Sequence, residues 1–124
     1  MIPHRGGCFC GKITFEFFAP KQIEVLDCNC SICSRSRYLH LIVPHENFRL
    51  LCGESESESY QFGTLTAKHY FCPNCGVKSF YQPRSHPDSY SVNLRCVDSS
   101  NFETVTSTIF DGRNWEKAKD VLDA

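Results

Sequence analysis

The chain has 124 residues and a formal net charge of −1, a length that suggests one domain with one hydrophobic core. The near-neutral charge gives no overall electrostatic drive toward nucleic acid or an anionic membrane, and no apolar run approaches the roughly 20 residues that a membrane-spanning helix needs. The first residues hold no apolar segment typical of a signal peptide, so we expect a soluble, cytoplasmic protein.

Segments with alternating apolar and polar side chains recur along the chain, separated by glycine and proline, which is typical of many short strands. In chain order, strands are predicted at residues 12–17, 23–27, 38–43, 48–52, 60–62, 67–71, 77–81, 90–96 and 103–110. Residues 31–36 are predicted to form one helical turn, and spaced apolar residues in 115–122 predict a short terminal helix. The predicted fold class is mainly β, in a single domain over residues 1–124.

Nine cysteines are the main chemical signal of the sequence. In a reducing compartment, clustered cysteines are more often metal ligands or catalytic groups than disulfides. We therefore favour metal binding over a disulfide framework or an iron–sulfur cluster. Soft thiolate donors suit Zn²⁺ in particular.

Cys72 and Cys75 form a Cys-x-x-Cys turn followed by Gly76, the pattern of a zinc knuckle. Two ligands do not complete a site, and Cys8 and Cys10 form the other clean pair. Together the four thiols predict a closed structural zinc site that ties the N-terminus to the middle of the chain and contributes substantially to folding. The alternative is two independent half-sites or core cysteines.

Cys28, Cys30 and Cys33 remain as three thiols within six residues. Three protein ligands leave one tetrahedral position open, which is the arrangement of catalytic zinc. A metal there lowers the pKa of a coordinated thiol and polarises a carbonyl group. The alternative is a second closed site, and the spacing does not choose between the two. The candidates for a fourth ligand are Cys52, Cys96 and His69.

Other residues near these motifs have both a functional and an ordinary interpretation. Arg35 and Arg37 follow the three thiols directly and could bind a carboxylate bidentately, or could be ordinary surface charge. His69 could face the open site, or could be a hydrogen-bonded strand residue. Cys52 and Cys96 stand singly in predicted strands, where a buried core thiol is the better interpretation.

The three cysteine motifs, in this order, resemble those of the glutathione-dependent formaldehyde-activating enzymes, a family that includes centromere protein V. The motifs are Gly7-Cys8-x-Cys10-Gly11, Cys28-x-Cys30-x-x-Cys33 and Phe71-Cys72-x-x-Cys75-Gly76. The resemblance extends to residues 66–71, 83–88 and 110–116, and so covers nearly the whole chain.

The resemblance implies a β-tent fold of short antiparallel sheets around a structural zinc, and a second zinc that is labile or absent in some states. It places the structural zinc on Cys8, Cys10, Cys72 and Cys75, and the second zinc on Cys28, Cys30 and Cys33. It also implies a carbon–sulfur lyase activity, the addition of glutathione to formaldehyde, which gives S-(hydroxymethyl)glutathione.

We therefore expect an enzyme that joins glutathione or another small thiol to a small aldehyde. Cys28, Cys30 and Cys33 would be its catalytic residues, and Arg35 and Arg37 would bind glutathione. The first alternative is a non-catalytic zinc module that binds glutathione, protein or chromatin, although the absence of a basic cluster weighs against direct DNA binding. The second alternative is a redox or zinc-donor protein, because clustered thiolates release zinc when they form a disulfide.

Overall fold

The structure is a computed structural model that describes residues 1–53, 58–60, 67–98, 101–114 and 116–117. Within these ranges the chain is mostly β, as predicted, with two sheets and few helices. In the described part of the chain, no helix is long and apolar enough to cross a membrane.

The small sheet is antiparallel and has the strand order β1, β2, β5. Its strands are Ile2–Gly7 (β1), Thr14–Ala19 (β2) and Phe48–Cys52 (β5). The sequence analysis does not predict β1, because this segment contains Pro3, Gly6 and Gly7, residue types that are depleted in strands. Pairing with β2 along the whole of β1 outweighs that local preference.

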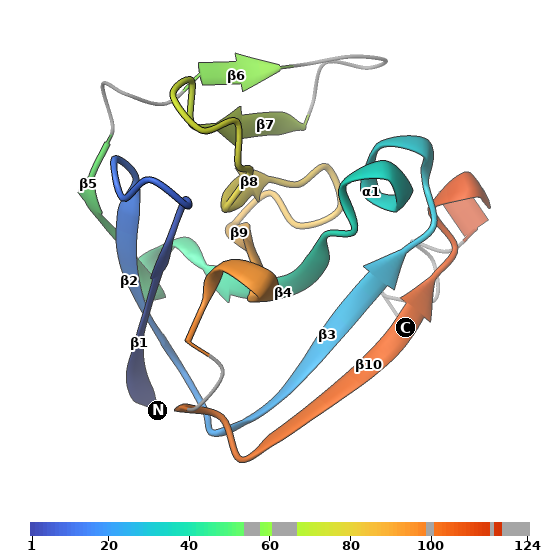
Figure 1. The fold of residues 1–124 in the computed structure, drawn as a ribbon. Helices are drawn as coiled ribbons and strands as arrows, with labels where there is room; N and C mark the ends of the chain where they lie inside the picture. The colour runs from blue at the N-terminus through green and yellow to red at the C-terminus, as the bar shows by residue number, and fades with distance from the viewer. Residues whose placement is uncertain (54–57, 61–66, 99–100, 115, 118–124) are drawn as a thin grey trace.

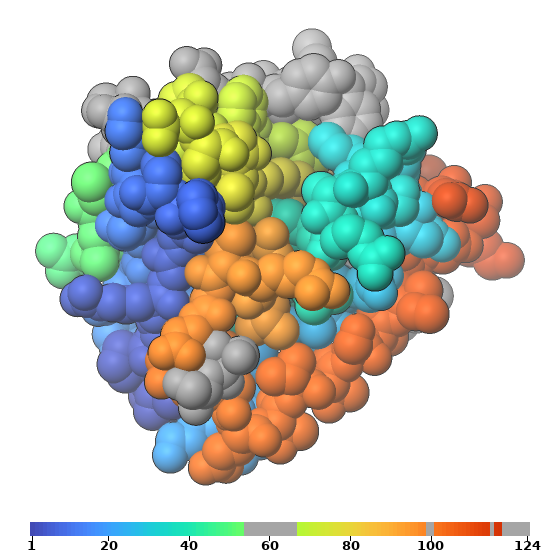
Figure 2. Space-filling view, viewed as in Figure 1, coloured from blue at the N-terminus to red at the C-terminus, as the bar shows by residue number. Residues whose placement is uncertain are grey.

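The large sheet has the strand order β10, β3, β4, β9, β8, β7, β6. Its strands are Gln22–Cys28 (β3), Leu39–Pro44 (β4), Glu58–Tyr60 (β6), Lys68–Phe71 (β7), Phe80–Gln82 (β8), Ser89–Asn93 (β9) and Thr104–Phe110 (β10). A short helix, α1 (Ser31–Ser36), connects β3 to β4, as predicted. Figure 1 shows α1 above the ends of β3 and β10, and the space-filling view shows it against the residues that follow β10 (Figure 2).

One strand pairing differs from the implied antiparallel sheets. β10 pairs with β3 in the parallel direction, from Thr104 opposite Gln22 to Phe110 opposite Cys28 (Figure 1). The two strands therefore end together, and the chain that leaves β10 lies beside the cysteines that follow β3.

Two predicted strands are shorter in the structure. The predicted strand 77–81 begins only at Phe80, and the predicted strand 90–96 ends at Asn93. The side chain of Asn93 accepts a hydrogen bond from the backbone N–H of Arg95 (3.1 Å) and starts the 3-10 turn Leu94–Cys96. The predicted strand 60–62 and the predicted helix 115–122 lie largely outside the described residues.

The hydrophobic core lies between the two sheets. Phe15 and Phe17 of β2 are fully buried, and the ring of Phe15 meets Phe80 of β8 edge-on at 5.7 Å between centroids. Val25 of β3 and Val92 of β9 belong to the same cluster. Alternate residues of β2, and of the first half of β3, thus supply the core, as the period of two predicts.

Candidate metal centres

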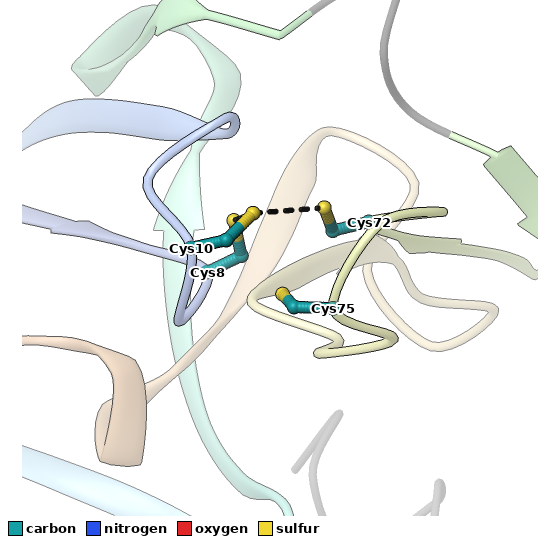
Figure 3. A group of neighbouring side chains, drawn as sticks. All are labelled: Cys8, Cys10, Cys72 and Cys75. Atoms are coloured by element: carbon teal, nitrogen blue, oxygen red, sulfur yellow. Dashed lines mark hydrogen bonds between the residues drawn. The ribbon is translucent and has the colours of Figure 1, made fainter.

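The first cysteine cluster joins the two cysteine pairs that the sequence predicts to meet. The donor atoms of Cys8, Cys10, Cys72 and Cys75 all lie within 4.8 Å of one another (Figure 3). The sulfur of Cys10 lies 3.7 Å from that of Cys8 and 3.6 Å from that of Cys72. A tetrahedron of sulfurs about 2.3 Å from a zinc ion has edges of about 3.8 Å. The cluster therefore has the dimensions of a four-thiolate metal site.

Two tight turns present these sulfurs. One connects β1 to β2, and the other follows β7. Gly11 and Gly76 adopt positive φ angles of 84° and 76° in them, a conformation that glycine adopts without strain. The backbone N–H of Ile13 points at the sulfur of Cys8 (3.3 Å), and this type of hydrogen bond stabilises a thiolate. The structure thus brings the pairs into one cluster rather than two half-sites.

The second cluster lies where β3 ends and α1 begins. Cys28 is the last residue of β3, Cys30 is the N-cap of α1, and Cys33 is the buried residue of α1. The sulfur of Cys30 accepts a hydrogen bond from the backbone N–H of Cys33 (3.4 Å). The donor atoms of Cys28, Cys33 and His40 lie within 4.8 Å of one another. Sequence reasoning missed His40, because it stands between Leu39 and Leu41 and no local pattern distinguishes it from an ordinary polar strand residue.

The three thiols of this cluster have different pKa values. Hydrogen bonds from Cys28 and Cys33 lower the pKa of Cys30 to about 2. The hydrogen bond with Cys30 raises the pKa of Cys28, and hydrogen bonds with Cys28 and Cys30 raise that of Cys33, above the ordinary value of a thiol. Three thiolates this close repel one another, so full ionisation of the cluster requires a cation. The donor set therefore fits a soft divalent metal such as Zn²⁺.

Hydrogen bonds of Asn29 hold the segment after β10 against this cluster. The side chain of Asn29 donates to Asp111 (3.0 Å) and accepts from the backbone N–H of Arg113 (3.1 Å). The carbonyl of Asn29 accepts from the guanidinium Nε of Arg113 (3.0 Å). Between these contacts, Gly112 leaves no room for a side chain, because a Cβ there would collide with the sulfur of Cys28.

A cavity of about 510 Å³ adjoins the second cluster, a size that suits a small-molecule ligand. Its wall combines the candidate metal donors Cys28, Cys30, Cys33 and His40 with apolar, aromatic and cationic side chains. The apolar part includes Leu26, Ile32, Ile42 and Phe110, and the polar part includes His69, Tyr81, Arg84 and Arg113.

Neither of the arginines proposed from sequence lines this cavity. Arg35 donates to the carbonyl of Ser31 in its own helix (2.8 Å), and Arg37 ends α1 with φ 58°. The guanidinium groups in the wall are those of Arg84 and Arg113, which come from the loop after β8 and the turn after β10. Sequence reasoning missed both arginines, because their approach depends on tertiary structure.

His69 does face the cavity, as one of its predicted interpretations has it. It is buried, and its Nδ1 lies 2.5 Å from the amino group of Lys78. Its ring stacks on Tyr81 with centroids 4.8 Å apart. Burial and the nearby Lys78 lower the pKa of His69 to about 4, so the ring is neutral near pH 7. His69 is not part of the donor group of Cys28, Cys33 and His40.

The two single cysteines also lie outside both donor groups among the described residues. Cys52 is exposed, so its predicted place in the core is wrong: it ends β5, an edge strand of the small sheet. Cys96 is half-buried in the 3-10 turn after β9, and burial raises its pKa to about 11. Neither thiol serves as a fourth ligand of the second cluster in this geometry.

Comparisons with known proteins agree with these observations. Residues 3–112 match the sequence model of the family described as glutathione-dependent formaldehyde-activating enzyme. A crystal structure of a Rhodobacter sphaeroides protein, a Northeast Structural Genomics target, superposes with a TM-score of 0.69 at 32% sequence identity. The match covers 84% of this chain and 99% of that chain. The chain therefore belongs to the glutathione-dependent formaldehyde-activating enzyme family.

Proposed function

We propose that the protein is a carbon–sulfur lyase-type enzyme that adds the thiol of glutathione, or of a related small thiol, to formaldehyde or a related small aldehyde. The observation that carries this proposal is the cavity of about 510 Å³ with the second cysteine cluster in its wall. Family membership supplies the substrate class. The whole chain, residues 1–124, would act as one domain.

Two zinc ions fit the two donor sets. Cys8, Cys10, Cys72 and Cys75 would hold a structural ion, and Cys28, Cys30 and Cys33 would hold a second one beside the cavity. Zinc bound at the second cluster supplies a Lewis acid that favours thiolate formation and polarises a carbonyl oxygen. The remaining chemistry is carried by the side chains around the cavity.

The reaction forms one C–S bond and moves one proton. The sulfur of the thiolate attacks the aldehyde carbon, the π electrons of the C=O bond move to the oxygen, and that oxygen takes up the proton that the thiol has lost. The enzyme therefore needs a hydrogen-bond donor near the aldehyde oxygen, where negative charge develops.

His69 is the residue that we assign to this donor role. The ammonium group of Lys78 can only donate, so Nδ1 of His69 accepts its hydrogen bond and the ring proton resides on Nε2. A neutral imidazole that lines the cavity in this tautomer can donate to the developing alkoxide.

Arg84 and Arg113 are the residues that we propose for the carboxylates of glutathione, in preference to Arg35 and Arg37. Both line the cavity, and guanidinium groups bind carboxylates bidentately. Arg84 is already paired with Glu116 (2.6 Å), so a ligand carboxylate would compete with an exposed carboxylate there.

The test is the rate of exchange between formaldehyde and its glutathione adduct, measured by two-dimensional exchange NMR with and without protein. We expect the protein to raise the exchange rate above the spontaneous rate. Cys33→Ser should abolish this enhancement, whereas Cys52→Ser, a change at an exposed thiol, should leave it intact. Glutathione binding without any rate enhancement would overturn the enzymatic proposal and favour a non-catalytic glutathione-binding module.

A further inference from the structure

One ring nitrogen of His40 is buried without a hydrogen-bond partner among the described residues. Its side chain is 5% exposed, and Nδ1 lies 2.9 Å from the hydroxyl of Ser91 and 3.2 Å from that of Tyr81. Nε2 is buried and has no hydrogen-bond partner among the described residues. A buried polar atom in this state is unfavourable unless something else binds it.

The position of the ring identifies what Nε2 could bind. His40 belongs to the group of donors within 4.8 Å of one another, together with the sulfurs of Cys28 and Cys33, and all three residues are buried. Cys30 is outside that group and half-buried. Two cysteines and one histidine are an established donor set for zinc with a fourth position that can change its ligand.

The contacts of Nδ1 prepare Nε2 for this role. A hydroxyl oxygen can accept a hydrogen bond, so Nδ1 can donate its proton to Ser91 and leave the lone pair of the ring on Nε2. Metal-bound histidines commonly donate their second ring nitrogen in this way, which fixes both tautomer and orientation. Ser91 is itself fully buried on β9, so this support is rigid.

We propose that His40 is a permanent ligand of the second metal site, with Cys28 and Cys33, and that Cys30 is the ligand that an incoming thiol replaces. Cys30 lines the cavity, and its sulfur keeps a hydrogen bond from Cys33 N–H when it leaves the metal. In the exchange, the incoming thiol loses its proton to solvent and binds as a thiolate, and Cys30 leaves as a thiolate, so the number of thiolates bound to the metal is unchanged. The inference rests on the metal of the proposed function but not on its reaction.

The first test uses Co²⁺ in place of zinc, without thiol or aldehyde. His40→Asn is the informative change, because asparagine can keep the hydrogen bond of Nδ1 while it removes Nε2. We expect this variant to bind the first equivalent of Co²⁺ at the four-cysteine cluster normally and to bind the second at least about tenfold more weakly. His69→Asn, the same change at another buried histidine of the cavity, is the matched control and should bind two equivalents.

Cys30→Ser separates the two roles at the cluster. We expect this variant to keep the second equivalent of Co²⁺, with weaker sulfur-to-cobalt charge-transfer absorption. Equal second-site affinity and an unchanged spectrum in His40→Asn, or complete loss of the second equivalent in Cys30→Ser alone, would overturn the proposal.

A measurement on the unaltered protein keeps the test independent of folding of the variants. In ¹⁵N-labelled protein loaded with ¹¹³Cd²⁺, we expect scalar coupling between one cadmium and the Nε2 of one histidine, and none at the other cadmium. Two cadmium signals without coupling to any histidine would refute the assignment of His40, whatever the catalytic assay shows.

Discussion

Gly112 lies so close to Cys28 that a methyl group on its α-carbon would overlap the sulfur of Cys28. We predict that Gly112→Ala displaces this sulfur and lowers second-site metal affinity by at least about tenfold. Overpacking of this kind typically costs about 1–3 kcal/mol of stability. The measurement is zinc content after gel filtration, together with the free energy of unfolding.

Gly11→Ala is the contrasting variant for this prediction. A Cβ at Gly11 would meet no atom within 4 Å, but the residue has a positive φ and adjoins Cys10 of the first cluster. Gly11→Ala should therefore leave the second site intact. Equal metal loss at the second site in both variants would contradict a steric effect that is specific to Cys28.

The four-cysteine cluster should determine whether the domain folds. Structural zinc contributes about 10–16 kcal/mol of apparent binding free energy in zinc-finger peptides, which matches or exceeds a typical net stability of about 5–15 kcal/mol. We predict that Cys72→Ser, a change at a fully buried cysteine of this cluster, unfolds the domain or lowers its melting temperature drastically. Circular dichroism during thermal unfolding measures this.

Two further variants serve as controls for the result with Cys72→Ser. Cys52→Ser changes an exposed thiol outside both clusters and should alter stability by no more than about 0.5 kcal/mol. Cys33→Ser should keep the fold while it loses the second metal. A Cys72→Ser protein with unaltered thermal unfolding would show that the first cluster is dispensable for folding.

The first cluster could be predicted from sequence because each half is a local motif. Gly11 directly follows the pair Cys8 and Cys10, and Gly76 directly follows the pair Cys72 and Cys75, so spacing alone indicates two pairs of ligands. The order of strands was not needed to join them. Most strands were predictable for a similar reason, since their alternating pattern is local.

The rest of the second site depends on contacts that no local pattern reveals. Arg113 and Gly112 reach the cysteines because β10 pairs with β3 in parallel, a pairing of distant segments. Arg84 reaches the cavity from the loop after β8. In the sequence, His40 is an ordinary polar residue of a strand. Only the pairing of β4 with β9 shows that Ser91 lies beside its ring.

The cavity arginines should govern glutathione affinity. A hydrogen bond to a charged group is worth about 1.5–3 kcal/mol, so we predict that Arg84→Ala and Arg113→Ala each raise the KM for glutathione about tenfold or more. The kcat should change less, because the carboxylates do not react. Steady-state kinetics at varied glutathione concentration measures the split between KM and kcat.

Arg35→Ala provides the control for both arginine variants. This exposed arginine bonds the carbonyl of Ser31 and does not line the cavity, so its loss should leave KM unchanged. A raised KM in Arg35→Ala with normal KM values in Arg84→Ala and Arg113→Ala would return the carboxylate-binding role to α1.

Lys78 should give the reaction an alkaline limit. Burial lowers the pKa of Lys78 to about 8. Below that pH the ammonium donates to Nδ1 of His69 and keeps the imidazole proton on Nε2. Above it the neutral amine can accept a hydrogen bond instead, so the tautomer is no longer fixed. We predict that the rate relative to the spontaneous reaction falls as the pH rises through about 8.

Lys78→Met should lower the relative rate below pH 8 by about tenfold or more and should remove the alkaline decline, because one positioned hydrogen-bond donor to a developing oxyanion contributes about 10²–10³-fold. Lys12→Met, a change at an exposed lysine, should keep both the rate and the decline. The pH profile of adduct exchange, divided at each pH by the spontaneous rate, provides the measurement. An alkaline decline that persists in Lys78→Met would assign it to another group and remove the reason for placing the proton of His69 on Nε2.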